Sequence, residues 1–271
     1  MTTLQALLFG CLQGIAEFLP VSSSGHLVLL KRLFGLEDVP QLFDVLLHIA
    51  TLVVVCHTFR RTIAELFGAL GRFILRRGIE GDSGRLRLIL AIIIATFLTG
   101  CIGLAIKDYG EALSAQTVSA LLLVTAFILL ATRWLEIRKQ KAGHGEPART
   151  PGIQAGVITG IAQGIGVLPG ISRSGITISA ALFAGVSRPA AGEFSFLLSV
   201  PAILGALVLS LRHTGELAAT VPPAALIAGM ASAMVTGWLS LSFLLRMIRG
   251  GRLYVFAAYL LPVGICGIIF L

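Results

Sequence analysis

Two short polar segments interrupt an otherwise apolar chain, and the second begins 150 positions after the first. Residues 13–26 read QGIAEFLPVSSSGH, and residues 163–176 read QGIGVLPGISRSGI. When the numbering is shifted by 150, a Gln, two Gly, an Ile and two Ser of the first segment align with identical residues of the second. Each segment also carries one charge, Glu17 in the first and Arg173 in the second. A repeated polar interruption of this kind is typical of a functional site inside a bilayer.

Composition places the rest of the chain in a membrane. Hydrophobic residues make up 56% and charged residues only 13%, which is outside the range of ordinary soluble domains. A membrane span needs roughly 20 mainly apolar residues, and six stretches approach that length. We therefore expect one integral membrane domain over residues 1–271, all α-helical, with six transmembrane helices. The expected spans are 42–59, 88–106, 118–134, 194–211, 224–245 and 253–271.

The net charge of +8 is better explained by membrane topology than by nucleic-acid binding. The basic residues occupy particular loops and do not form one face with interleaved aromatic residues, so nucleic acid is excluded as a partner. Sixteen lie in loops on one side of the predicted spans, against four on the other, which places the crowded loops in the cytoplasm and both termini outside. The sixteen are Arg60, Arg61, Arg72, Arg76, Arg77, Arg85, Arg87, Arg133, Arg138, Lys139, Lys141, Arg149, Arg188, Arg246, Arg249 and Arg252; the four are Lys31, Arg32, Lys107 and Arg212.

This topology predicts that both polar segments lie in hairpins. Residues 4–34 must begin and end outside and residues 153–184 inside, and each stretch is broken near its middle by Pro, Gly and Ser. We expect two re-entrant helical hairpins whose tips meet near the midplane. Three spans separate them, so the second hairpin is inverted relative to the first. The prediction is an inverted-topology repeat, with repeat one over 1–134 and repeat two over 152–271.

The hairpin tips have the composition of an anion site. After Pro20, three serines precede an apolar run that predicts a helix; after Pro169 and Gly170, the sequence SRSG precedes another. Serines in these positions can cap helices whose N-terminal N–H groups face the tip. Two helix N-termini and one arginine would suit a phosphate group.

Glu17 needs a partner at this depth, because an unpaired carboxylate in a bilayer costs about 2.5–3.5 kcal/mol. Gln13 lies four residues earlier, on the same helical face. Arg173 is one candidate for the charged partner, and a divalent cation bridging Glu17 to phosphate oxygens is the other. His26 lies within one turn of the serines and suits proton transfer with a Ser hydroxyl. His48 and the nearby Asp44 either line the cavity mouth or face a neighbouring span.

Both segments resemble the signature motifs of the undecaprenyl-diphosphate phosphatase family, bacterial enzymes linked to bacitracin resistance. The family's first motif is Glu or Gln, three residues, Glu, then FLPVSS-S/T-GH, which residues 13–26 match. Its second motif, PG-x-SRS-x-x-T, is matched by residues 169–177. The similarity extends to EFSFLLSVP at 193–201 and to the hydropathy pattern, so it covers nearly the whole chain.

The resemblance implies hydrolysis of undecaprenyl diphosphate to undecaprenyl phosphate and inorganic phosphate. This reaction recycles the lipid carrier for cell-wall synthesis and gives bacitracin resistance. It also implies a multi-pass protein of the bacterial plasma (inner) membrane, with lipid around it and an active site opening to the outer side. The cofactor implied is a divalent cation, Mg or Ca.

The roles implied by the resemblance fall on both motifs. Many family members have Glu where this chain has Gln13, so a metal site with two carboxylates is not expected here. The implied catalytic residues are Glu17, Ser23 (nucleophile), His26 (proton partner of the serine) and Arg173 (phosphate clamp); the substrate-binding residues are Ser22, Ser24, Gly25, Ser172, Ser174 and Thr177; the metal ligands are Gln13 and Glu17.

Other interpretations remain open at this point. The serines and glycines could serve helix packing alone, Glu17 and Arg173 could form a purely structural ion pair, and His26 could only cap a helix. A polyprenyl-phosphate transporter or flippase would share the inverted-repeat architecture, whereas an anion channel fits less well because one Arg and one Glu make a poor continuous path. The glycines at 229–237 indicate either tight helix packing or the face of a homodimer.

Overall fold

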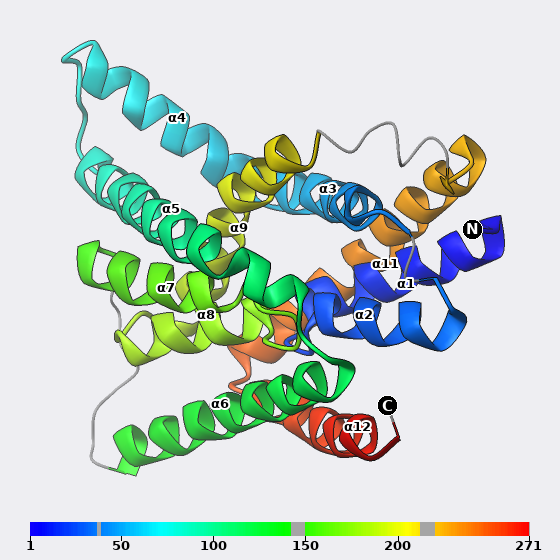
Figure 1. Cartoon of the computed structure of the whole chain (residues 1–271). Coiled ribbons are helices and arrows are strands. Elements are labelled where there is room, and N and C mark those ends of the chain that lie inside the picture. The colour runs from blue at the N-terminus through cyan, green and yellow to red at the C-terminus, as the bar shows by residue number, and fades with distance from the viewer. Residues whose placement is uncertain (37–38, 142–149, 212–219, 271) are drawn as a thin grey trace.

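The computed structural model describes residues 1–36, 39–141, 150–211 and 220–270, and these ranges are built from helices joined by turns (Figure 1). Arg149, Arg212 and Leu271, which took part in the topology and span predictions, lie outside the described residues. The helices are α1 (Thr3–Phe18), α2 (Ser23–Phe34), α3 (Gln41–Thr58), α4 (Arg60–Ile74), α5 (Asp82–Glu111), α6 (Ala115–Lys141), α7 (Ile153–Ile165), α8 (Arg173–Phe183), α9 (Arg188–Ser210), α11 (Pro223–Arg249), the 3-10 helix η2 (Leu253–Phe256) and α12 (Ala257–Phe270).

Six helical stretches in the described part of the chain are long and apolar enough to cross a membrane. They are α3, α5, α6, α9, α11 and the continuous η2–α12 segment, so the number of long apolar helices agrees with the six predicted spans. Several helices are longer than predicted: α5 begins at Asp82 rather than at 88, and α6 continues to Lys141 rather than to 134. Hydropathy locates only the apolar part of a span, whereas the helix continues into its polar flanks.

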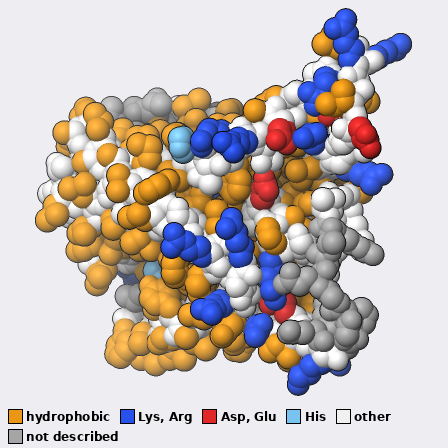
Figure 2. Space-filling model, turned by 180° about the vertical axis from the view of Figure 1, so that it is seen from behind, with side chains coloured by type: hydrophobic (Ala, Val, Ile, Leu, Met, Phe, Trp, Pro, Cys, Tyr) orange, Lys and Arg blue, Asp and Glu red, His pale blue; other side chains and the backbone are white. Residues whose placement is uncertain are grey.

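A helix occupies part of the region that the sequence analysis treated only as a basic loop. α4 (Arg60–Ile74) packs against α5 and buries Leu66 and Ala69. The guanidinium of Arg72 on α4 donates two hydrogen bonds to the carboxylate of Asp82 at the start of α5, at 2.9 and 2.6 Å. This helix was not predicted from the sequence, because arginines are interspersed among its apolar residues, which have helical spacing. Figure 2 shows the wider pattern, in which Lys and Arg side chains gather over one part of the surface and hydrophobic side chains cover another.

Glycines allow two pairs of helices to pack unusually closely. α1 packs along α11, and a Cβ atom at Gly10 would lie only 2.0 Å from the carbonyl oxygen of Gly229. α7 packs along α5, and a Cβ at Gly160 would lie 2.6 Å from Cα of Ala95. Positions 10 and 160 correspond under the shift of 150. The glycines of the 229–237 stretch therefore serve helix packing within the chain, one of the two alternatives the sequence left open.

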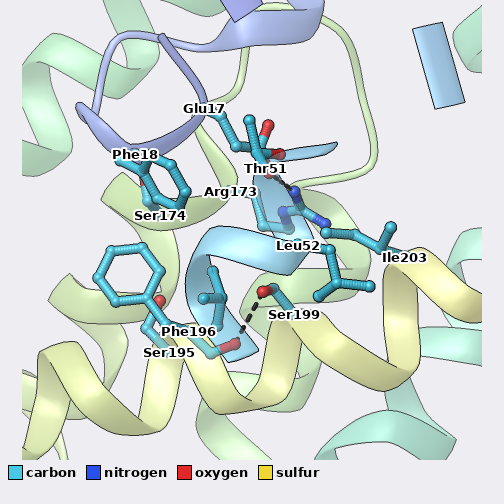
Figure 3. A pocket seen from close by; sticks show the side chains of 11 residues that line it. Glu17, Phe18, Thr51, Leu52, Arg173, Ser174, Ser195, Phe196, Ser199 and Ile203 are labelled. Carbon is cyan, nitrogen blue, oxygen red and sulfur yellow. Dashed lines mark hydrogen bonds and ion pairs between the residues drawn. The ribbon is translucent and has the colours of Figure 1, made fainter. Parts of the chain in front are cut away.

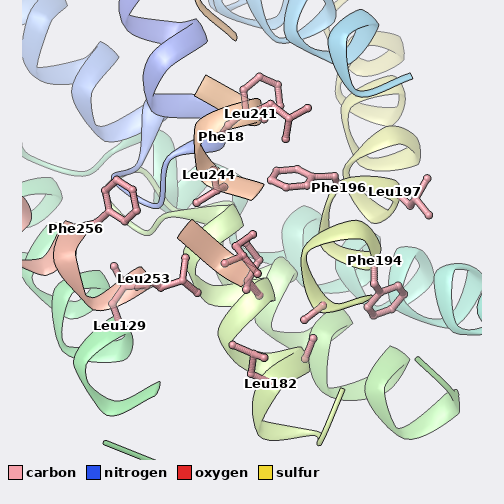
Figure 4. Close-up of a cluster of buried hydrophobic side chains, with 14 of the residues drawn as sticks. Phe18, Leu129, Leu182, Phe194, Phe196, Leu197, Leu241, Leu244, Leu253 and Phe256 are labelled. Atoms are coloured by element: carbon pink, nitrogen blue, oxygen red, sulfur yellow. The ribbon is translucent and has the colours of Figure 1, made fainter. Parts of the chain in front are cut away.

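Apolar side chains fix the end of α1 against the spans. Phe18, the last residue of α1, packs edge-on against Phe196 of α9 with ring centroids 5.7 Å apart. The same buried cluster includes Leu241 and Leu244 of α11 (Figure 4). Elsewhere α6 pairs with α12, and α3 pairs with α9. Glu17 directly precedes Phe18, so this packing also helps to position the carboxylate of Glu17.

Candidate active site

The first polar segment forms a tight turn between two short helices. α1 ends at Phe18, Pro20 lies in the turn, and α2 begins at Ser23. Ser22 adopts a left-handed backbone conformation with φ of 69°, and its hydroxyl accepts a hydrogen bond from the N–H of Gly25 at 3.2 Å. Ser22 therefore caps α2, as the sequence predicted.

The second polar segment forms the equivalent turn between α7 and α8. Ser172 caps α8 by accepting a hydrogen bond from the N–H of Gly175 at 3.1 Å. Thr125 of α6 supports the turn from outside. Its hydroxyl donates to the carbonyl of Gly170 at 3.1 Å and accepts from the N–H of Ser172 at 3.0 Å. The predicted break and cap are both present.

The two turns contact each other directly. The N–H of Gly170 donates to the hydroxyl of Ser22 at 3.1 Å, and that hydroxyl donates to the carbonyl of Ile171 at 3.3 Å. The backbones approach so closely that a Cβ at Gly25 would lie 2.9 Å from Gly170. The first turns of α2 and α8 therefore start from one shared junction, with Ser22 bonded to both segments.

Glu17 is the centre of the polar contacts at this junction, and its side chain is only 6% exposed. One carboxylate oxygen, Oε1, accepts from the guanidinium of Arg173 (Figure 3). The other, Oε2, accepts from the hydroxyl of Ser23 at 2.8 Å and from the amide of Gln13 at 2.9 Å. Nε2 of His48 lies 3.3 Å from the same oxygen. The buried charge thus has a cationic partner and several donors, the condition under which such a charge is tolerated.

His26 is hydrogen-bonded to groups other than the hydroxyl of Ser23, its predicted partner. Nδ1 lies 2.9 Å from the carbonyl oxygen of Ser22, and Nε2 lies 2.9 Å from the hydroxyl of Tyr259 on α12. A carbonyl can only accept, so Nδ1 carries the proton and Nε2 accepts from the tyrosine. The hydroxyl of Ser23 is bonded to Glu17 instead. The structure therefore brings Glu17, and not His26, into hydrogen-bonding contact with Ser23.

The remaining predicted residues lie around the start of α8 and α2. Ser172 and Ser174 are buried and their hydroxyl oxygens are 3.2 Å apart. The hydroxyl of Thr177 donates to the carbonyl of Arg173 at 2.7 Å and lies 2.5 Å from the hydroxyl of Ser195. Ser24 is partly exposed in the first turn of α2.

A small cavity adjoins the ion pair of Glu17 and Arg173. Its lining comes from α1, α3, α8 and α9 and combines hydroxyl groups with apolar side chains. Figure 3 shows Ser199 and Ile203 of α9 on the side of the cavity facing Arg173. A polar site with an apolar wall is consistent with a charged head group attached to a hydrocarbon chain.

These residues do not by themselves form a site for a resident metal ion. The described residues contain no cluster of three His, Cys, Asp or Glu side chains that could hold a metal. Both oxygens of Glu17 already have partners, one of which is the cationic Arg173. Gln13 Oε1 is buried without a hydrogen-bond partner among the described residues, so it offers one neutral oxygen. A single amide oxygen is far from the six or more oxygen ligands of Mg or Ca.

Two contacts of the site come from residues that the motifs do not include. Tyr259 reaches His26 across 233 positions of the chain, and nothing in the sequence around it signals this contact. For His48 the sequence left two alternatives, lining the cavity mouth or facing a neighbouring span. Its approach to Glu17 shows that it faces the site.

Comparison with known proteins identifies the family of this chain. Residues 6–266 match the family model described as "Bacitracin resistance protein BacA". The chain is similar to proteins named undecaprenyl-diphosphatase from several organisms. The relative from Treponema denticola is 49% identical over 98% of this chain and 96% of its own length; that from Carboxydothermus hydrogenoformans is 42% identical over 98% and 96%; that from Borrelia hermsii is 38% identical over 95% of each. With the family match over nearly its full length, the chain is a multi-pass membrane protein that belongs to the bacitracin resistance protein BacA family.

Proposed function

We propose that this protein is an undecaprenyl-diphosphatase, which hydrolyses undecaprenyl diphosphate to undecaprenyl phosphate and inorganic phosphate. The observation that carries the proposal is the hydrogen bond from Ser23 to Glu17, whose carboxylate also holds Arg173. A hydroxyl, a base and a phosphate-binding cation thus meet at the N-termini of two helices, as phosphoryl transfer requires. The names of the relatives point to the same reaction.

The geometry supports a mechanism in which Ser23 is the nucleophile and Glu17 its base. A terminal phosphate placed at the junction would take over the guanidinium of Arg173 and free Oε1 of Glu17. Glu17 Oε2 then accepts the Ser23 proton while Oγ attacks the terminal phosphorus. The bond to the bridging oxygen breaks, and undecaprenyl phosphate leaves with both electrons of that bond. Water next attacks the phosphoserine, and the bond between phosphorus and Ser23 Oγ breaks. The proton held by Glu17 returns to Oγ, and both protons of the water leave with the inorganic phosphate, which restores the serine and the carboxylate.

The backbone supplies further stabilisation for the transferred group. The N-terminal N–H groups of α2 and α8 point toward the shared junction and carry the positive end of each helix dipole. We assign the binding of phosphate oxygens to Ser24, Ser172, Ser174 and Thr177 together with these N–H groups. Ser22 and Gly25 keep the two segments in contact and thereby place the donors.

A divalent cation fits this proposal as a counter-ion of the substrate rather than as a resident of the protein. The diphosphate itself offers several charged oxygens, to which Gln13 Oε1 could add one protein ligand. Magnesium should then bind the substrate-free protein weakly, whereas a chelator should still lower turnover. Equilibrium dialysis with Mg²⁺ and no substrate tests this, and tight stoichiometric binding would contradict it.

The finer architecture is also part of the proposal. We propose that α1–α2 and α7–α8 are re-entrant hairpins of an inverted repeat, within repeats 1–134 and 152–271. The reciprocal packing of α1 on α11 and of α7 on α5, through glycines at matched positions, supports it. We place the protein in the plasma membrane with the site opening to the outer side, on the distribution of Lys and Arg and the family's cell-wall role. A transporter without hydrolysis is less well supported, because transport does not need a serine bonded to a base.

Phosphate release by purified protein in detergent, with undecaprenyl diphosphate as substrate, tests the function. Ser23→Ala should abolish release, and Glu17→Gln should lower turnover by about 100-fold or more, since a general base contributes about 10²–10⁴-fold. Ser242→Ala is the matched control, because this partly exposed serine lies outside the site and its hydroxyl donates to the carbonyl of Trp238 in its own helix. Release that survives Ser23→Ala unchanged would reject the nucleophile, and no release by the wild-type protein would reject the function.

A further inference from the structure

His48 approaches Glu17 from a different helix than the other residues of the site. Its Nε2 atom lies 3.3 Å from Glu17 Oε2, and its side chain is 20% exposed. Gln13, which also contacts Oε2, lies on α1 with Glu17 itself. His48 lies on α3, so it ties the carboxylate to a helix that neither polar segment contains.

The orientation of the His48 ring is fixed from its opposite side. Nδ1 lies 2.7 Å from the carbonyl oxygen of Asp44, one turn earlier on α3. A carbonyl oxygen and a carboxylate oxygen can only accept, so in these contacts both ring nitrogens act as donors, Nδ1–H toward Asp44 and Nε2–H toward Glu17. The start of α3 is itself held, because Lys31 of α2 donates to the carboxylate of Asp44 at 2.7 Å and to the carbonyl of Val39 at 3.2 Å. The ring therefore projects from a fixed backbone in a fixed orientation.

We propose that His48 is a positioning residue for the hydrolysis, and that it holds Oε2 of Glu17 toward Ser23. This inference rests on the proposed function. The terminal torsion of a Glu side chain has a broad, roughly two-fold profile, so its carboxylate turns easily unless both oxygens are held. Arg173 holds Oε1 only until a phosphate takes over its guanidinium. After that exchange, His48 is the contact from outside the two polar segments that keeps the carboxylate aligned, among the described residues.

Two nearly isosteric substitutions separate positioning from packing. In His48→Gln, the amide nitrogen can occupy the place of Nε2 and still reach Glu17. In His48→Asn, the amide nitrogen can occupy the place of Nδ1 and reach the Asp44 carbonyl, but nothing replaces Nε2. Both variants remove the ring, but the Gln variant keeps the contact with Glu17 and loses the one with the Asp44 carbonyl, whereas the Asn variant does the reverse. His57→Gln is the matched control, because His57 is exposed at the far end of the same helix.

The assay is phosphate release from undecaprenyl diphosphate, with kcat and KM measured separately and the melting temperature of each variant recorded. We expect His48→Asn to lower kcat by about 10- to 100-fold, with KM changed less than about 3-fold, because a misplaced reacting group costs rate rather than binding. His48→Gln should keep kcat within about 3-fold of the wild-type value.

Each contrary outcome overturns the inference in a different way. Wild-type kcat in His48→Asn would show that the contact with Glu17 has no catalytic consequence. Equal losses in the Asn and Gln variants would show that the ring itself is needed, and a rise in KM alone would assign His48 to substrate binding. Failure of the proposed function is distinguishable, because the wild-type protein would then release no phosphate.

Discussion

Gly170 offers the sharpest test of whether the contact between the two turns sets the rate of hydrolysis. Its φ of +97° lies in the region that favours glycine, and a Cβ atom there would lie 2.3 Å from the carbonyl oxygen of Val118 and 2.7 Å from Cβ of Leu121. The substitution Gly170→Ala therefore combines an unfavourable backbone conformation, about 1–2 kcal/mol, with overpacking, about 1–3 kcal/mol. We expect a loss of about 2–5 kcal/mol in unfolding free energy.

The larger expected effect of Gly170→Ala is a displacement of the second turn. To reach an ordinary contact of 3.4 Å with Val118, the turn must move away from α6 by about 1 Å. Arg173 follows three residues later, and Gly170 is hydrogen-bonded to Ser22, so both segments would shift. A misplacement of about 1 Å can cost about 100-fold in rate. We expect kcat of phosphate release to fall by about that factor in protein that still shows a cooperative melting transition.

Gly205→Ala is the control, because a Cβ built at that helical position would meet no described atom within 4 Å beyond its own stretch of helix backbone. Thr125→Val supplies a second route to the same displacement, since it removes the hydroxyl that holds Gly170 and Ser172 without changing side-chain volume appreciably. It should cost about 1–3 kcal/mol and lower kcat less than Gly170→Ala does. If folded Gly170→Ala and Thr125→Val both keep wild-type kcat, the position of the second turn does not limit catalysis.

Three further substitutions have expected outcomes. Arg173→Lys should lower kcat of phosphate release by about 100-fold or more, because a point charge cannot replace a guanidinium fork; unchanged turnover would reject the clamp. Ser22→Ala removes a cap and both hydrogen bonds between the turns, and should lower the unfolding free energy by about 1–3 kcal/mol in thermal melts, whereas Ser242→Ala should not. Tyr259→Phe leaves Nε2 of His26 without its donor and should cost about 1–3 kcal/mol by the same measurement; an unchanged melting temperature would contradict that hydrogen bond.

Features that depend on local sequence were predictable. The six spans followed from hydropathy, and the breaks at Pro20 and Gly170 with their capping serines followed from the stereochemistry of single residues. The pairing of Glu17 with Arg173 was one of two alternatives, because a buried carboxylate requires a cation and the repeat supplied only one in its motifs. In each case the physical cause lies within a few residues of the feature or in the balance of charge.

Partners of individual side chains were harder to predict. His26 follows Ser23 by three residues, which made it the natural proton partner, but its ring is turned to the Ser22 carbonyl and to Tyr259 on the last helix. α4 was missed because the many arginines of its region masked apolar residues at helical spacing. Sequence spacing describes one helix at a time, whereas these contacts depend on how helices distant in the chain are packed.

In the proposed mechanism, the four groups around Glu17 give the carboxylate two successive roles. Without substrate, Arg173 and Glu17 neutralise each other, so the site does not keep an isolated charge in a largely apolar interior. A diphosphate that binds Arg173 removes this partner and adds negative charge beside the carboxylate, and both changes favour transfer of the Ser23 proton to Glu17. By this mechanism, we expect the base to become effective only when a phosphate is in place to be attacked. Because Gln13, Ser23 and His48 all contact Oε2 and not Oε1, the oxygen that receives the proton stays aligned while the other is released.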